Sequence, residues 1–142
     1  METKNIFPAR IDLLRVMLDW IYERIERMEF DPSTLRKVEL AAEEALVNII
    51  RHAYQGQPEN IEIEIKVFPK SHVEISIRDN GPPFNPLTVH PPDLASPLEE
   101  REIGGLGIHF IKNNMDEVRY NRLDNANVIV LVKRATRPFQ TM

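Results

Sequence analysis

The sequence contains no cysteine among its 142 residues. The chain therefore forms no disulfide, offers no thiol nucleophile and builds no cysteine-based zinc site. It also lacks an apolar run near the ~20 residues that a membrane-spanning helix needs. Its first ten residues, METKNIFPAR, contain no apolar segment typical of a signal peptide. These absences predict a soluble cytoplasmic protein with no membrane partner.

Negative charge is in small excess, since 18 basic and 22 acidic residues give a net charge of −4. No basic patch stands out, so nucleic acid is not an expected partner. The four histidines, at positions 52, 72, 90 and 109, lack zinc-binding spacing such as H-x-x-x-H, so no zinc site is expected. The length and the 42% hydrophobic content predict one domain over residues 1–142.

The first half of the chain predicts a short strand at residues 3–7 and then two helices. Asp31 and Pro32 predict that the second helix begins there, and it should run to about Tyr54. Trp20 and Tyr22 lie off the apolar stripe of the first helix, so they are candidates for an exposed partner surface. The stripe itself is expected to pack on the core, and its members are Ile11, Leu14, Leu18, Ile21, Ile25 and Met28.

The second half predicts strands in antiparallel pairs. IEIEIKVF and VEISIRD alternate apolar and polar residues around the turn PKSH, and DEVRY and NVIVLVKR are expected to close the sheet. Between the pairs, residues 82–103 hold six of the eleven prolines and predict a loop, and GGLGIHFIKNNM predicts a third helix. Residues 135–142 are expected to be a frayed tail. The order predicts an α+β fold with one mixed, mostly antiparallel sheet and three main helices on one face.

Asp79 stands where the alternation of VEISIRD places an inward side chain. Asp-Asn-Gly is strong turn chemistry, so one interpretation is a turn-forming acid. The other interpretation is a buried carboxylate, which needs hydrogen-bond donors such as an adenine amino group and water. In that case Gly81 would let the base approach the backbone closely.

Glu44 and Asn48 lie four residues apart on the second predicted helix, hence on one face. They fall on a narrow polar strip beside Lys37 and Arg51. The helix alone favours an ordinary solvent-facing strip, with a contact from Glu44 to Lys37 or Arg51. The alternative is a carboxylate and a carboxamide that together hold a hydrated cation and a water.

The glycines from Gly104 to Gly107 precede the third predicted helix. Free backbone N–H groups at a helix N-terminus favour phosphate, although a plain loop-to-helix entry is the alternative. This stretch is neither a P-loop nor a G-x-G-x-x-G motif, because no strand leads into it and the lysine is missing.

In this order the motifs resemble the GHKL, or Bergerat-fold, ATPase superfamily. Within it the chain looks like the small serine kinases of bacterial partner-switching modules, the anti-sigma-factor kinases. EEALVNIIRHAY is similar to the N-box, DNGPPFNPL to the first glycine box and GGLGIHFIKNNMDEVRY to the second. The resemblance extends from about Arg10 to Arg134, and it implies a Bergerat α/β sandwich with a proline-rich ATP lid over about residues 84–103.

The resemblance also implies roles for individual residues. Glu44 would be the general base, Asn48 the Mg²⁺ ligand, and Asp79 with Gly81 would hold adenine. The remaining ATP-binding positions implied are Gly104, Gly105, Leu106, Gly107 and Ile108. Pro83 departs from the superfamily pattern, which has glycine there, and Ala126-Asn127 stands where a Gly-Thr pair is common. Candidate phosphate or nucleotide contacts are Arg51, Arg101, Asn127 and, as an alternative to simple packing, His52.

The function that the resemblance implies is an ATP-dependent protein-serine kinase with ATP/ADP and Mg²⁺ as cofactors. It would phosphorylate a STAS-domain, anti-anti-sigma-like protein and sequester a sigma factor or another regulator, and a homodimer is expected. The alternative is a non-catalytic ATP-binding module that only sequesters its partner. The catalytic domain of a histidine kinase is less favoured, because no helix pair with an acceptor histidine precedes the fold.

Overall fold

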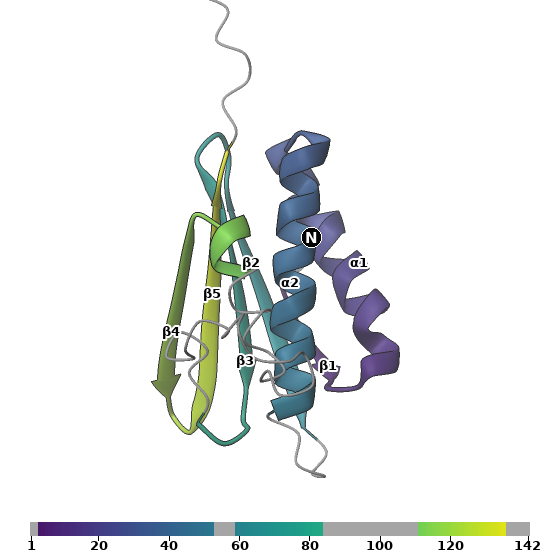
Figure 1. Ribbon diagram of the computed structural model, residues 1–142, viewed down its shortest axis with the longest axis vertical. Helices are drawn as coiled ribbons and strands as arrows, with labels where there is room; N and C mark the ends of the chain where they lie inside the picture. Colours follow the sequence, from purple (N-terminus) through teal and green to yellow (C-terminus); the bar gives the residue numbers. More distant parts are fainter. Residues whose placement is uncertain (1–2, 53–58, 84–110, 136–142) are drawn as a thin grey trace, which may run out of the picture.

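The computed structural model describes residues 3–52, 59–83 and 111–135. They form a five-stranded sheet with helices on one face (Figure 1). The elements in chain order are β1 (Lys4–Pro8), η1 (Ile11–Leu13), α1 (Leu14–Ile25), η2 (Glu26–Met28), α2 (Pro32–His52), β2 (Asn60–Phe68), β3 (His72–Asp79), β4 (Glu117–Leu123) and β5 (Ala126–Arg134). Residues 111–114 add a helical turn before β4.

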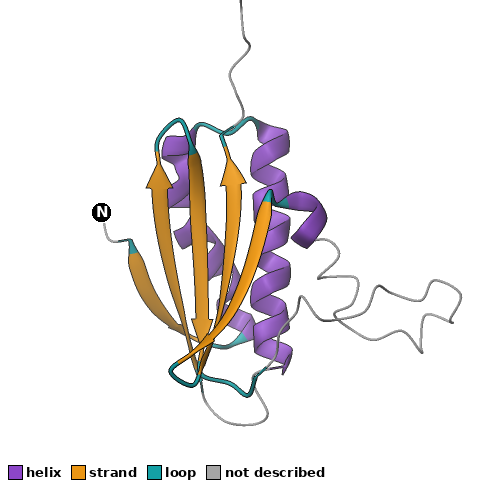
Figure 2. Ribbon diagram, turned by 90° about the vertical axis from the view of Figure 1, so that its left-hand side faces the viewer, coloured by secondary structure: helices purple, strands orange, loops and turns teal. Residues whose placement is uncertain are grey.

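The strands are ordered β1-β2-β3-β5-β4. Every pairing among the described strands is antiparallel, so this part of the sheet contains no parallel pair and is not mixed. Both predicted hairpins, β2–β3 and β4–β5, are confirmed. The helices cover one face, here called the inner face, and no described helix lies on the opposite face, here called the open face (Figure 2). None of the helices in the described stretches is long and apolar enough to cross a membrane.

The predicted start of α2 is confirmed at atomic detail. The carboxylate of Asp31 accepts a hydrogen bond of 2.7 Å from the backbone N–H of Thr34, and Pro32 occupies the first turn, where no N–H is needed. This bond to the backbone of Thr34 lowers the pKa of Asp31. The helix is described as far as His52, and the predicted end at Tyr54 lies outside the described residues.

The apolar stripe of the first helix is largely confirmed, with Leu18, Ile21, Ile25 and Met28 buried. Leu14 is half-buried against the core, and Ile11 is the exception, because the residue is 60% exposed. It belongs to the 3-10 turn η1, and α1 begins only at Leu14, so the α-helical spacing does not extend back to Ile11. Met17, which the stripe omitted, is fully buried.

Trp20 and Tyr22 are half-buried rather than part of an open partner surface. The ring of Trp20 packs edge-on against Phe7 of β1 with centroids 5.9 Å apart, and the guanidinium of Arg24 lies 3.9 Å over it. The Tyr22 hydroxyl donates a hydrogen bond to Glu39 of α2. Burial together with this bond raises the pKa of Tyr22 to about 12. Both side chains therefore bind neighbouring elements of the fold.

The core lies between α2 and the inner face of the sheet. Small side chains on α2 let the helix approach closely, and each isoleucine that the strands bury against it contributes roughly 1.5–3 kcal/mol. The fully buried members include Val38, Ala41, Ala42 and Leu46 of α2 and Ile61, Ile63, Ile75, Ile77 and Leu131 of the strands.

Residues 84–110 and 136–142 lie outside the described residues, and with them most of the predicted loop, the beginning of the third helix and most of the tail. The described end of that helix is tied to the sheet. Met115 is buried, and the Asp116 carboxylate accepts a 2.6 Å hydrogen bond from the backbone N–H of Arg134. These contacts of Met115 and Asp116 with the sheet direct the chain out of the helix, which ends at residue 114, and into β4.

Candidate functional site

Asp79 is the last residue of β3 and is 3% exposed. Along β3 buried and half-buried residues alternate strictly, and Asp79 continues the buried set after Val73, Ile75 and Ile77. The prediction of an inward-facing carboxylate is confirmed.

Asp79 also forms the predicted turn. Its Oδ1 accepts a 2.9 Å hydrogen bond from the backbone N–H of Gly81 and a 3.2 Å bond from Nδ2 of Asn127. Within the described residues, Oδ2 receives no hydrogen bond. One oxygen of the carboxylate is therefore held by the protein, and the other is left for a donor from elsewhere.

Asn127 is the centre of a polar network at this end of the sheet. Its Oδ1 accepts hydrogen bonds from the Tyr120 hydroxyl at 2.6 Å and from the Arg122 guanidinium at 3.2 Å. Its Nδ2 donates to the Pro82 carbonyl at 2.9 Å as well as to Asp79. Arg122 donates in turn to the Gly81 carbonyl at 2.7 Å. The last hairpin thus holds the turn that follows β3.

Burial raises the pKa of Asp79, while the bonds from Gly81 and Asn127 and the charge of Arg122 act in the opposite direction. A second carboxylate, Glu59, lies close enough to be affected: burial and then the charge of Asp79 raise its pKa. Oε2 of Glu59 is buried without a hydrogen-bond partner in the structure as described. The site therefore has more acceptors than donors, which favours a ligand that brings N–H groups.

Asn48 is 5% exposed, and its Nδ2 is buried with no hydrogen-bond partner among the described residues. Glu44, one turn earlier, is half-buried, and no ion pair joins it to Lys37 or Arg51 in the described part of the chain. The solvent-facing interpretation favoured by the helix alone is therefore wrong for Asn48. A buried carboxamide without a partner costs about 1–3 kcal/mol, which a ligand would offset.

Both groups of residues lie toward one end of the molecule. Asn48 is in the last turns of α2, and α2 ends at the same end of the sheet as β3 and the β4–β5 turn (Figures 1 and 2). Arg51 is exposed near the end of α2. Gly104, Gly105, Leu106, Gly107, Ile108, Arg101 and the side chain of His52 lie outside what the structure describes.

Sequence reasoning missed Tyr120, Arg122 and Glu59. A signal for the first two was present in the letters LDNA. Asp124 and Asn125 both have positive φ, 50° and 63°, which is typical of a two-residue hairpin turn. Such a turn sets Arg122 directly opposite Asn127. No comparable signal identified Glu59, because its position next to Asp79 depends on how β2 enters the sheet.

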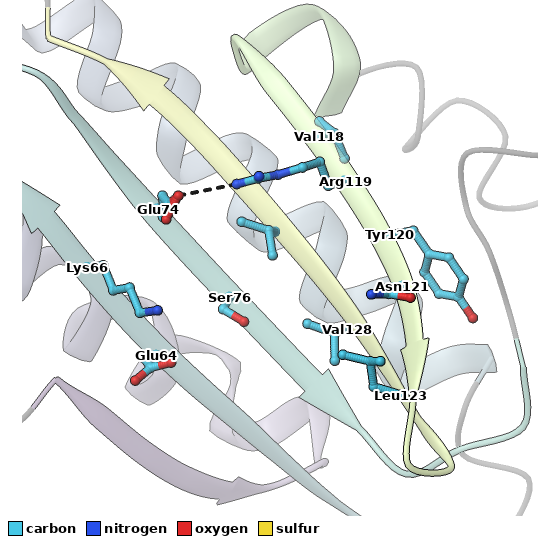
Figure 3. Close-up of a pocket in the computed structure, with 11 residues that line it drawn as sticks. Glu64, Lys66, Glu74, Ser76, Val118, Arg119, Tyr120, Asn121, Leu123 and Val128 are labelled. Atoms are coloured by element: carbon cyan, nitrogen blue, oxygen red, sulfur yellow. Dashed lines mark hydrogen bonds and ion pairs between the residues drawn. The ribbon is translucent and has the colours of Figure 1, made fainter.

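The open face of the sheet carries a hollow of about 680 Å³ that contains none of the predicted site residues (Figure 3). An Arg119–Glu74 ion pair of 3.2 Å crosses it. The lining residues mix charged and aliphatic groups: Glu64, Lys66, Glu74, Ser76, Val118, Arg119, Tyr120, Asn121, Leu123, Val128 and Val130.

Residues 7–133 match the family of histidine kinase-like ATPase domains. The chain belongs to that family. The GHKL resemblance is thereby confirmed. Asn48 and Asp79 both lie within the matched residues. The site residues themselves stay predictions.

Similar proteins agree with this assignment. The chain is 27% identical to the "Serine-protein kinase RsbW" of Listeria monocytogenes over 128 residues, which cover 87% of this chain and 79% of the relative. It is 32% identical to the "Serine/threonine-protein kinase BtrW" of Bordetella bronchiseptica over 97 residues, 68% of each chain.

A crystal structure of the RsbU and RsbW domains of Rv1364c from Mycobacterium tuberculosis has the same fold, with a TM-score of 0.64 at 15% identity. The match covers 96% of this chain and 34% of that one, so this chain spans about a third of that protein.

Proposed function

We propose that this ATPase-family protein is an ATP-dependent protein-serine kinase of a partner-switching module. It phosphorylates a serine of a STAS-domain, anti-anti-sigma-like protein and sequesters a second partner, such as a sigma factor. The names of the relatives support the kinase class. The observation that carries the ATP site is the buried carboxylate of Asp79, which has one oxygen held by the protein and one without a donor.

Adenine suits this carboxylate because its 6-amino group supplies N–H donors. Oδ2 of Asp79 accepts one of them, and the carboxylate of Glu59 adds negative charge beside it. Gly81, whose N–H is already bonded to Asp79, offers no Cβ that would obstruct a flat base. A 6-oxo purine would instead place an oxygen against Oδ2, which is unfavourable.

Asn48 fits a Mg²⁺ site. Mg²⁺ keeps several waters and binds few protein oxygens together with substrate phosphates, so a single buried carboxamide suits it, and the half-buried carboxylate of Glu44 one helical turn away stays available as a base. The unpartnered Nδ2 of Asn48 shows that its carboxamide is not fixed by hydrogen bonds to the described residues. When bound, the ion would neutralise charge on the phosphates.

Glu44 acts as the general base in this proposal. The substrate serine Oγ attacks the γ-phosphorus of ATP, the bond to the bridging oxygen of ADP breaks, and Glu44 takes the serine proton. Phosphoryl transfer depends mainly on positioning and charge, so one base suffices. The backbone N–H groups of residues 104–108 hold the phosphates, Arg51 and Arg101 are further contacts, and residues 84–103 close over the nucleotide.

The test incubates the protein with Mg²⁺, γ-labelled ATP and the STAS-domain proteins of the same genome. Wild type is compared with Glu44→Ala and Asp79→Asn. An acid-stable label on one STAS protein, lost in both variants, supports the proposal and identifies the partner. An acid-labile label indicates phosphohistidine and contradicts it.

The same variants separate catalysis from sequestration. If Glu44→Ala binds ATP and still restrains its partner fully, the kinase step is dispensable and the protein is an ATP-binding sequestering module. Light scattering on the protein with and without ATP tests the homodimer expected from the sequence, which a monomeric mass would contradict.

A further inference from the structure

Asn127 is a buried carboxamide whose two ends are both occupied. It is 6% exposed, and it pairs directly with Asp79 across β3 and β5. Its Oδ1 receives two donors, and its Nδ2 serves two acceptors, Asp79 and the Pro82 carbonyl. A polar residue so fully bonded in a low-dielectric environment is held in one orientation.

That orientation is decided by Arg122, which can only donate, and by the Asp79 carboxylate and the Pro82 carbonyl, which accept, while the Tyr120 hydroxyl supports it. A flipped carboxamide would place its NH₂ against two donors and its oxygen against the Asp79 carboxylate and the Pro82 carbonyl. The Tyr120 hydroxyl could turn to accept from the flipped NH₂, but the Arg122 guanidinium cannot accept, and neither the Asp79 carboxylate nor the Pro82 carbonyl can donate. Three of the four contacts would then become unfavourable, so Nδ2 must point at Asp79.

We propose that Asn127, oriented by Tyr120 and Arg122, is the positioning residue that keeps Asp79 a hydrogen-bond acceptor and reserves its Oδ2 for the 6-amino group of a purine. The preference for a 6-amino purine rests on the proposed ATP site, whereas the effect of Asn127 on the protonation of Asp79 does not. Since Oδ1 already receives two N–H donors, a proton on Asp79 can reside only on Oδ2. A protonated Oδ2 would donate, and it would then suit a 6-oxo purine instead.

The balance at Asp79 is set by few groups in the described structure. Burial favours the neutral acid of Asp79, and the donors Gly81 and Asn127 and the charge of Arg122 favour the carboxylate. Removing the donor Asn127 therefore raises the pKa of Asp79. The ionised form that accepts the amino group is then lost at a higher pH than in wild type.

The experiment compares wild type with Asn127→Ala, Asn127→Thr and Tyr120→Phe. Asn121→Ala is the matched control, because it removes an exposed carboxamide from the open face of the same hairpin (Figure 3). The Asp79 carboxyl is titrated by carbon-13 NMR in ligand-free protein and assigned with Asp79→Asn. Affinities for ATP and ITP, which differ at the 6-position in amino against oxo, are measured across the same pH range.

We expect Asn127→Ala to raise the pKa of Asp79 and to weaken ATP binding about tenfold or more, since one hydrogen bond to a charged group is lost. The loss should grow as the pH falls, and the preference for ATP over ITP should shrink. Asn127→Thr retains a hydroxyl donor, so it should shift the pKa of Asp79 and weaken ATP binding less than Asn127→Ala does. Asn121→Ala should match wild type.

An unchanged Asp79 titration in Asn127→Ala overturns the inference, even if ATP binding is weaker at every pH, because the residue would then be merely structural. If Asn127→Ala does not fold, the titration of Tyr120→Phe decides instead: loss of the hydroxyl that supports the Asn127 carboxamide should raise the pKa of Asp79, and an unchanged titration overturns the inference. A shifted titration in a protein that binds no ATP contradicts the proposed function and leaves the positioning of Asp79 supported.

Discussion

Two neighbouring rows of side chains on the inner face of the sheet differ sharply in chemistry. Each row crosses β2, β3, β5 and β4 at paired positions. The apolar row is Ile63–Ile77–Ile129–Tyr120, and the polar row is Ile61–Asp79–Asn127–Arg122.

The apolar row is what a sheet under a helix requires, and it contributes stability by burial. The polar row, one step closer to the end of the sheet, has the same backbone pairing but buries a carboxylate and a carboxamide. Such groups cost free energy unless they are bonded, and one oxygen of Asp79 is not bonded within the described residues. On β2, β3 and β5 the contrast shows that fold and ligand recognition are separated by a single row, while on β4 Tyr120 of the apolar row also donates to Asn127 of the polar row.

The largest effect on ATP affinity should come from changing Asp79, the member of the polar row on β3. Asp79→Asn keeps an oxygen for Gly81 and Asn127 but turns an N–H toward the purine amino group, so ATP affinity should fall by on the order of 10⁴-fold. Its stability should be unchanged or higher, because a buried charge is removed. Isothermal titration calorimetry and urea unfolding check both quantities.

Ile77→Ala, in the apolar row, should do the reverse. It leaves a cavity and should lower the free energy of unfolding by about 2–5 kcal/mol, with ATP affinity of the folded protein retained. If both variants lose stability and affinity in parallel, the rows do not have separate roles.

Catalysis should be separable from binding on α2. Glu44→Gln should reduce phosphoryl transfer to the STAS substrate by about 10²–10⁴-fold, the usual contribution of a general base, with little change in ATP affinity. Glu43→Gln is the control, because this neighbour on α2 is also half-buried. Equal losses in the two variants would argue that charge on α2, rather than one base, matters.

The apolar row was predictable from sequence. Isoleucine at every second position of β2 and β3 specifies which face is buried, and the short turn at Lys70 fixes the pairing. Asp79 was identified because it is a charged residue at a position where the alternation of β3 places a buried isoleucine or valine.

The polar row was only half predictable. The burial of Asn48 contradicted the interpretation that its helix alone favoured, because a helical wheel cannot tell which narrow polar strip faces a sheet. Arg122 and Tyr120 matter only through the register of the β4–β5 hairpin, and Glu59 only through contact in space. Residues that act on a site through another side chain follow no periodic pattern by which the sequence alone could identify them.

A smaller effect concerns the pH dependence of stability. Burial raises the pKa of Asp79 in the folded protein, so between its usual pKa and the raised one the folded chain binds more protons than the unfolded chain. The free energy of unfolding should therefore fall as the pH rises through that interval. Asp79→Asn should remove this contribution, while Glu59, whose pKa is also raised, retains one of the same sign. Urea unfolding of ligand-free wild type and variant over a pH series measures the difference, and identical slopes would contradict it.

The smallest effect is expected on the open face. Arg119 is 53% exposed and pairs with Glu74 across the sheet, so Arg119→Ala should change the free energy of unfolding by less than about 1 kcal/mol and leave ATP affinity unchanged. Arg122, three residues later on β4, faces inward and donates to Gly81 and Asn127. Arg122→Ala should therefore weaken ATP binding about tenfold through the loss of these bonds. Should Arg119→Ala weaken ATP binding as much as Arg122→Ala does, recognition would not be confined to the inner face, and the hollow across the open face would have to take part in it.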